Sequence, residues 1–181
     1  MLGIARYRVV GDPPKVDRCV LVAAPHTTNW DFPLMMAMAW QSGISIKWLG
    51  KDSLFRGPGG PLCRALGGIA VNRSNAGGMV ETLAKRFAEG EPLILAVPAE
   101  GTRSGGDYWK SGFHRIAVAA SVPIQLSFLD GPSRTGGFGP ALEPTDDLAA
   151  DMEAIRAFYD GKHGVKPENR TEPRLKGELG S

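Results

Sequence analysis

The sequence predicts one α/β domain, a single layered unit in which a largely parallel or mixed sheet is flanked by helices. Short apolar runs of strand length alternate along the chain with longer segments that have helical character. Gly and Pro residues separate these segments, and no internal repeat or linker interrupts them. With 181 residues, 43% of them hydrophobic and 22% charged, the chain has the composition of one globular domain. Alternation of strands and helices is typical of sheets with parallel neighbouring strands.

The first half of the chain contains three expected strands and two expected helices. Residues 20–24 form an unbroken apolar run that ends at Pro25, as in a buried strand. Pro33 suits a first helical turn, and a Met-rich segment continues that helix until Gly43 ends it. The remaining elements of this half are expected at residues 44–49 (strand), 62–66 (short helix) and 69–71 (strand).

The second half is expected to add two strands and three helices. Ser74 is a candidate N-cap for a helix with an apolar stripe at four-residue spacing, which Gly90 stops. The further strands are expected at residues 93–97 and 122–129, and the further helices at residues 111–120 and 147–159. Residues 131–140 are rich in Gly and predict a flexible loop. We assign residues 1–162 to the domain and residues 163–181 to a polar, loosely held C-terminal tail.

Composition argues against several classes of protein. The net charge of +2 is too small to indicate a nucleic-acid partner. Cys19 and Cys63 lie in apolar contexts without a CxxC pattern, which favours a reducing compartment over a disulfide or zinc framework. No signal-peptide pattern is visible, and the longest apolar run, residues 33–40, is shorter than the ~18 residues of a membrane span. We expect a cytoplasmic protein that at most lies peripherally on the inner face of a membrane.

His26 and Asp31 are the first candidate catalytic residues. His26 directly follows a buried strand, and Asp31 lies five residues later at a helix entrance. A base that acts on an alcohol needs an imidazole, and a carboxylate beside it fixes the imidazole tautomer and stabilises the imidazolium. Taken alone, the pair has an equally simple structural interpretation, in which His26 is a satisfied polar residue and Asp31 caps the helix.

A second polar loop follows the fourth expected strand. Glu100 opens it, Gly101 lets the backbone approach a ligand closely, and Arg103 can hold a phosphate with two hydrogen bonds. Arg73, beyond the third strand, suits an anionic headgroup, and Lys110 adds positive charge near Arg103. In isolation, each of these residues is as well explained by a polar turn or a solvated surface charge.

Four motifs in order carry a family resemblance. A His-x4-Asp motif spans residues 26–31, and a Gly-rich strand that ends in Arg spans residues 67–73. Glu-Gly-Thr-Arg stands at residues 100–103, and a Val-Pro-Ile strand begins at residue 122. With this set, the chain resembles the glycerolipid acyltransferases, whose best-known members are the lysophosphatidic acid acyltransferases. It looks like a short, catalytic-domain-only member, and the resemblance covers about residues 20 to 130.

The resemblance implies an O-acyltransferase, in which His26 is the base that activates an acceptor hydroxyl and Asp31 orients it. It implies a substrate-binding set of Arg73, Glu100, Gly101, Thr102, Arg103 and Lys110. The donor is expected to be acyl-CoA or acyl carrier protein, and the acceptor a glycerophospholipid-type lipid. We expect neither a cofactor nor a metal. We expect direct transfer without an acyl-enzyme, because no Gly-x-Ser-x-Gly elbow is present and neither cysteine is placed as a nucleophile.

Apolar residues around these motifs suggest lipid contacts. The Met-rich helix and the aromatic residues Trp30, Phe32 and Trp40 are expected to line an acyl groove, although core packing is the stronger interpretation for the helix. Trp48 and Phe55 are candidates for contact with a membrane interface.

Two other functions remain open at this point. A catalytically silent lipid-binding module of the same fold predicts loss of His26, Asp31 or Glu100, and all three are present. A metal-dependent hydrolase would need His26, Asp31 and His114 together, although His114 has the context of an ordinary helix residue.

Overall fold

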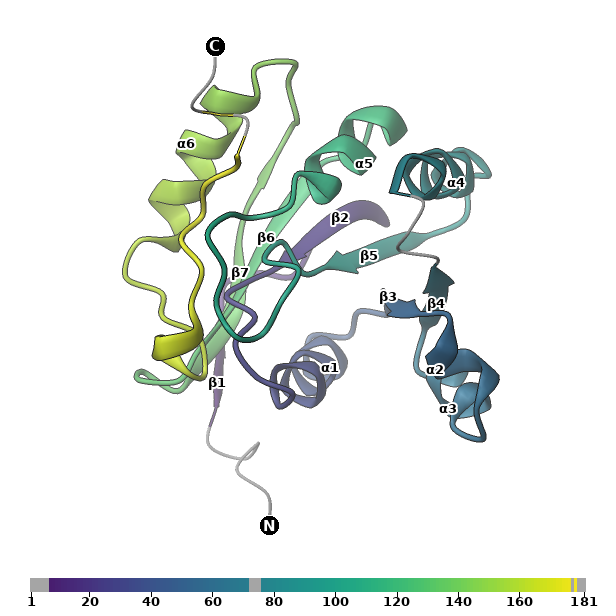
Figure 1. Cartoon of the computed structure of the whole chain (residues 1–181), viewed down its shortest axis with the longest axis horizontal. Helices are drawn as coiled ribbons and strands as arrows, with labels where there is room; N and C mark the ends of the chain where they lie inside the picture. Colours follow the sequence, from purple (N-terminus) through teal and green to yellow (C-terminus); the bar gives the residue numbers. More distant parts are fainter. Residues whose placement is uncertain (1–6, 72–75, 177, 179–181) are drawn as a thin grey trace.

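The computed structural model describes residues 7–71, 76–176 and 178. Within these residues, one mixed sheet of seven strands has the order β1-β7-β6-β2-β5-β3-β4 (Figure 1). The strands are β1 (Arg8–Val10), β2 (Arg18–Ala23), β3 (Ile46–Lys51), β4 (Gly68–Val71), β5 (Leu93–Val97), β6 (Ile124–Asp130) and β7 (Thr135–Leu142). Neighbouring strands run parallel except β6 and β7, which confirms the predicted α/β fold with a largely parallel or mixed sheet.

Helices cover both faces of the sheet. They are α1 (Asp31–Gln41), α2 (Ser53–Arg56), α3 (Gly60–Ala65), α4 (Ala76–Ala88), α5 (Gly112–Ala120) and α6 (Leu148–Tyr159). Side chains alternate along β2, so Val20 and Val22 pack with α4, α5 and α6, while Cys19 and Leu21 pack with α1 on the opposite face. A strand buried on both faces therefore has the unbroken apolar sequence that predicted it.

The predicted flexible loop at residues 131–140 is wrong, because most of it is strand β7. β7 pairs antiparallel with β6 on one side and parallel with β1 on the other. Its glycines permit close packing: a Cβ on Gly137 would lie 1.9 Å from the carbonyl oxygen of Val10, and one on Gly139 would lie 2.2 Å from a ring carbon of Phe158. Glycine at these positions reflects close neighbours instead of chain freedom.

The predicted loose attachment of the C-terminal tail is also wrong for its described residues. Thr171 and Leu175 are buried, and Leu175 forms a parallel bridge with Trp109. The backbone N–H of Trp109 donates to the carbonyl of Arg174 at 2.8 Å. We call residues 163–176 the C-terminal strap, since they run across the loops that follow β2 and β5.

The register of the sheet brings the two predicted functional loops together. β2 and β5 are adjacent and parallel, with Val22 opposite Val97. His26 and Glu100 follow these two residues by four and three positions. Both loops therefore leave the same carboxyl edge of the sheet, where ligand sites of open α/β folds lie. The described residues contain no helix long and apolar enough to cross a membrane.

Candidate active site

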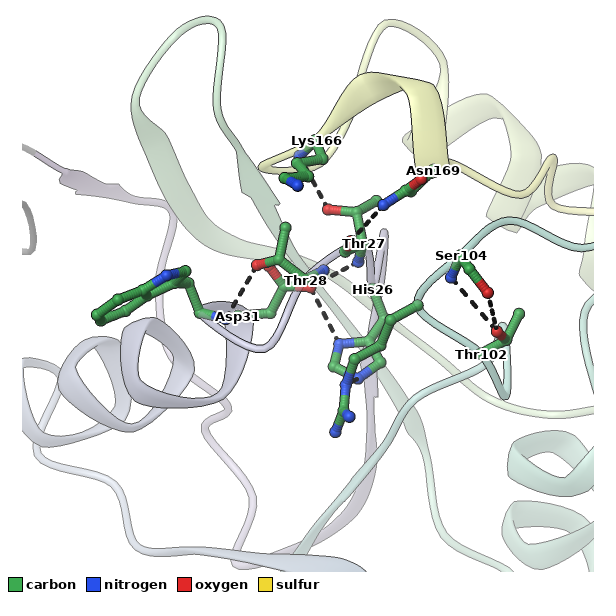
Figure 2. Close-up of polar contacts among 10 residues, drawn as sticks. His26, Thr27, Thr28, Asp31, Thr102, Ser104, Lys166 and Asn169 are labelled. Atoms are coloured by element: carbon green, nitrogen blue, oxygen red, sulfur yellow. Dashed lines mark hydrogen bonds and ion pairs between the residues drawn. The ribbon is translucent and has the colours of Figure 1, made fainter.

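His26 and Asp31 lie side by side at the carboxyl end of β2. His26 Nδ1 is 3.1 Å from Asp31 Oδ2. Asp31 is the first residue of α1, so the turn between β2 and this helix brings the carboxylate back to the imidazole (Figure 2). The His26 side chain is 16% exposed and that of Asp31 is 5% exposed, so the imidazole is reachable and the carboxylate is enclosed.

Two threonines between them orient the carboxylate (Figure 2). Asp31 Oδ2 accepts hydrogen bonds from the backbone N–H groups of Thr27, at 2.6 Å, and Thr28, at 2.9 Å. Asp31 Oδ1 accepts one from the hydroxyl of Thr28 at 2.9 Å. These donors satisfy a buried charge and hold it in one rotamer.

Arg103 determines which nitrogen of His26 carries the proton. Arg103 Nε donates a hydrogen bond to His26 Nε2 at 2.9 Å. Because a guanidinium has only donors, Nε2 is the unprotonated, accepting nitrogen. The proton of neutral His26 is then on Nδ1 and points at Asp31, and in this tautomer Nε2 is the basic nitrogen, as a general base requires.

Glu100 is a buried carboxyl without hydrogen-bond partners among the described residues. It is 1% exposed, and neither of its oxygens is hydrogen-bonded. Its pKa is raised to about 8. Burial is the main cause, and the charge of Asp31 acts in the same direction, while the nearby backbone N–H groups of His26 and Thr171 and the charge of Arg170 partly offset the rise. Glu100 is therefore a neutral acid at pH 7, enclosed beneath the two loops.

The rest of the Glu-Gly-Thr-Arg loop is more open. Gly101 has a φ of +70°, and a Cβ there would lie 3.0 Å from the side chain of Lys110, so this turn requires glycine. The hydroxyl of Thr102 lies 3.1 Å from that of Ser104 and accepts its backbone N–H at 3.3 Å (Figure 2). Lys110 is fixed through its backbone N–H, which donates to Ala99 at 2.7 Å, and its side chain is exposed.

A cavity of about 1150 Å³ adjoins these groups. The predicted site residues that line it are His26, Asp31, Gly101, Thr102, Arg103 and Lys110. Its apolar walls include Phe32, Met35, Met38, Trp48, Phe128 and Leu129. Glu100 is not in this lining, and Arg73 lies outside the described residues. The cavity is larger than the roughly 300–1,000 Å³ that is usual for small-molecule sites, and it combines an apolar wall with a cationic side.

Comparison with known proteins identifies the family of the chain. A sequence model of the acyltransferase family matches residues 6–125, which is most of the chain. The chain belongs to the acyltransferase family. This finding confirms the family resemblance that the four motifs indicate.

The fold of this acyltransferase-family chain is similar to that of a solved enzyme. That structure is the 1-acyl-sn-glycerophosphate (LPA) acyltransferase PlsC from Thermotoga maritima, with a TM-score of 0.57 and 20% sequence identity. The match covers 81% of this chain and 64% of the other chain, so this chain spans less than two thirds of the relative's length. The likeness shows a shared fold. A search of curated proteins finds no match.

The predicted lipid-facing aromatic residues of this acyltransferase-family chain divide into two groups. Phe32 and Trp48 line the cavity, with their ring centroids 4.8 Å apart. Phe55 is 4% exposed and packs against Trp48, so the prediction that it contacts a membrane is wrong. Trp30 and Trp40 are 58% and 64% exposed and are absent from the cavity lining, so the prediction that they line an acyl groove is wrong.

His114 belongs to a structural contact in this chain. Its Nε2 lies 2.7 Å from Asp151 Oδ2 and joins α5 to α6. Burial raises the pKa of Asp151, but hydrogen bonds from Thr145 and His114 outweigh burial and lower it below its usual value. Among the described residues, no three His, Cys, Asp or Glu side chains are grouped to hold a metal ion. The hydrolase alternative therefore lacks its ligand set.

Sequence reasoning missed the groups that support the catalytic pair. Thr27 and Thr28 lie inside the His-x4-Asp spacer, and a polar spacer before a helix is a detectable signal for such support. The strap adds two contacts to Thr27: Lys166 N–H donates to its hydroxyl and the Asn169 side chain donates to its carbonyl, each at 3.0 Å (Figure 2). No local pattern connects residues so far apart in sequence.

Proposed function

We propose that this chain transfers a fatty acyl group from an acyl thioester to a hydroxyl of a glycerophospholipid-type or related lipid acceptor. The observation that carries the proposal is the orientation of His26. Its Nδ1 faces Asp31, its Nε2 is the accepting nitrogen, and His26 lines a cavity with apolar walls. That arrangement suits a base acting on a hydroxyl beside an acyl chain.

In the proposed reaction, the acceptor O–H gives its proton to His26 Nε2. The oxygen forms a bond to the thioester carbonyl carbon, and the C–S bond then breaks. The departing sulfur takes the proton from Nε2 and leaves as a thiol. Asp31 stabilises the imidazolium between the two proton transfers. Cys19 is an unsuitable nucleophile, since burial raises the pKa of its thiol to about 12.

The walls of the cavity suggest how the substrates are divided. Its apolar side chains suit acyl chains, whereas Arg103 and Lys110 suit the phosphate of an acceptor. The Thermotoga maritima enzyme takes its name from a 1-acyl-sn-glycerophosphate, and its similar fold supports a lysophosphatidic acid type of acceptor here. The donor is acyl-CoA or acyl carrier protein, and the chemistry proposed needs no cofactor. Arg73 remains a proposed headgroup contact.

We further propose that the protein acts at the inner surface of a cytoplasmic membrane. Trp40 and Leu62 are 64% and 63% exposed, and Trp30 and Leu54 are also exposed. Large exposed apolar side chains near α1, α2 and α3 suit insertion into a lipid interface. The Trp40→Ala variant should bind anionic vesicles more weakly than the wild type in sedimentation, while equal binding would contradict this part of the proposal.

Thiol release from palmitoyl-CoA and from palmitoyl-acyl carrier protein tests the main proposal. The acceptors are lysophosphatidic acid, glycerol-3-phosphate and an uncharged glycolipid alcohol. His26→Ala should lower acceptor-dependent release by about 10²–10⁴-fold, the usual contribution of a positioned base. His163→Ala is the matched control, because the exposed His163 contributes its backbone N–H to Asp130 and is absent from the cavity lining.

Acceptor-dependent release that His26→Ala abolishes and His163→Ala retains would support the proposal and name the acceptor class. No release with either donor and any acceptor, from protein that still binds palmitoyl-CoA, would overturn it. That outcome would favour the lipid-binding module.

A further inference from the structure

Arg103 is hydrogen-bonded to Nε2 of His26, the atom that accepts the proton in the proposed reaction. The imidazole Nε2 has one lone pair, and the hydrogen bond from Arg103 Nε uses it. An acceptor hydroxyl cannot give its proton to a nitrogen whose lone pair is engaged in this way. The His26–Asp31 pair therefore has the correct tautomer, but its reactive side is covered.

The rest of the Arg103 guanidinium has no partner among the residues that the structure describes. Among the described residues it forms no ion pair with Asp or Glu and no hydrogen bond besides the one to His26. The side chain is exposed and lines the cavity. An exposed guanidinium held by one bond to a neutral imidazole exchanges that bond readily for two charge-assisted bonds to a phosphate.

We propose that Arg103 is a gate on His26 that an anionic acceptor opens. Without an acceptor, Arg103 covers Nε2 and protects the thioester from water, which would otherwise lose its proton to the same nitrogen and release a fatty acid and a thiol. When the phosphate of an acceptor enters, Arg103 turns to it and exposes Nε2 beside the acceptor hydroxyl. This proposal rests on the proposed function, since it assigns the gate to the same base and the same acceptor site.

The gate makes headgroup recognition part of catalysis. Lys110 can hold a phosphate by charge, but among the described residues it forms no hydrogen bond to His26, so phosphate binding to Lys110 does not change the base. Arg103 contacts His26 directly, so a ligand that moves it changes the base. An acceptor without an anionic group should therefore react slowly even at saturation, since it leaves Nε2 covered.

Chemical labelling of His26 tests the gate without any lipid. Diethyl pyrocarbonate labels an imidazole nitrogen with a free lone pair, and peptide mass analysis distinguishes His26 from His114 and His163. Arg103→Met should speed labelling of His26 by about 2- to 10-fold, the change that losing one ordinary hydrogen bond implies. Arg86→Met is the matched control: Arg86 is an exposed arginine on α4, absent from the cavity lining, so it should leave the rate unchanged. Equal thermal midpoints would show that both variants are folded.

Two further measurements make the test specific. Inorganic phosphate should speed labelling of His26 in the wild type and have no effect in Arg103→Met. Hydrolysis of palmitoyl-CoA without acceptor should rise in Arg103→Met, whereas transfer to lysophosphatidic acid should fall. A labelling rate of His26 that is the same in Arg103→Met and the wild type would overturn the gate, even if the wild type transfers acyl groups. Faster labelling of His26 in Arg103→Met, together with a wild type that transfers acyl groups to no acceptor, would contradict the proposed function. It would still support the conclusion that Arg103 covers Nε2.

Discussion

Thr28 binds Asp31 with both of its polar groups. Its backbone N–H donates to Oδ2 and its hydroxyl donates to Oδ1, each at 2.9 Å. The backbone N–H of Thr27 adds a third donor to Oδ2. With these donors in place, the carboxylate has one orientation, and in that orientation Oδ2 also faces Nδ1 of His26. Two residues inside the spacer of the His-x4-Asp motif thus hold its Asp in the orientation that faces its His.

The Asp31→Asn variant should lose turnover by about 10²–10⁴-fold. The amide oxygen can take the place of Oδ2 and keep the N–H groups of Thr27 and Thr28, but a neutral amide does not stabilise the imidazolium that forms on His26 as a carboxylate does. Steady-state kinetics with the best acceptor checks this, and an unchanged kcat would show that Asp31 does not assist His26.

Replacing Thr28 by Val should lower kcat by about 10-fold, because one hydrogen bond to a charged group is lost while the backbone donors remain. Thr28→Ser restores the hydroxyl and should recover most of the activity. The KM for the acceptor should change little in both variants, since Thr28 is absent from the cavity lining. If Thr28→Val loses activity and Thr28→Ser does not recover it, the loss comes from packing, and the hydroxyl does not align Asp31.

The stability of the fold should depend on pH through Glu100. The ordinary pKa is 4.5, and burial raises it to about 8 in the folded chain. Between these values the folded state holds one more proton than the unfolded state, so Glu100 makes the fold less stable as the pH rises, until the loss is complete above about pH 8.

Glu100→Gln removes this titration and leaves the other groups in place. Relative to the variant, the wild type should lose on the order of 2–3 kcal/mol of unfolding free energy between about pH 5.5 and 8.5. Urea unfolding of both proteins at several pH values measures the difference. A difference that stays constant over this range would mean that Glu100 is ionised in the folded chain.

Leu175 tests whether the strap is part of the fold. It is 2% exposed and pairs with Trp109. Leu175→Ala should lower the free energy of unfolding by about 2–4 kcal/mol through the lost contacts and the cavity left behind. Glu168→Ala, at an exposed position of the same segment, should change it by less than about 0.5 kcal/mol. Similar effects of the two substitutions would mean that the strap contributes little to stability.

Most elements could be predicted because their signals are local. The apolar run at residues 20–24 and its counterpart at residues 93–97 correspond to β2 and β5. The helix predicted from residue 147 corresponds to α6, in which the Asp147 side chain caps the first turn by accepting the N–H of Ala150. The sequence placed His26 and Glu100 after these strands, and parallel pairing of β2 with β5 brings their loops together.

The errors occur where distant residues decide the structure. Gly136 and Gly137 suggest a loop, but in the sheet they admit the side chain of Leu129 and the backbone of Val10. The strap has a polar, Pro-rich sequence, and its order depends on hydrogen bonds to Thr27 and Trp109 that no window of local sequence contains. For the same reason, the contact between Arg103 and His26, which are 77 residues apart, could not be predicted from either motif alone.

The strap also has a consequence for biosynthesis. Thr27 is made early, yet it receives its hydrogen bonds from Lys166 and Asn169 across separations of 139 and 142 residues. During translation, the loop that carries His26 therefore waits for almost all of the described chain before its surroundings are complete. A nascent chain that has already paired β2 with β5 would contain the catalytic motifs but not the finished site, so activity should appear only after residue 169 has left the ribosome.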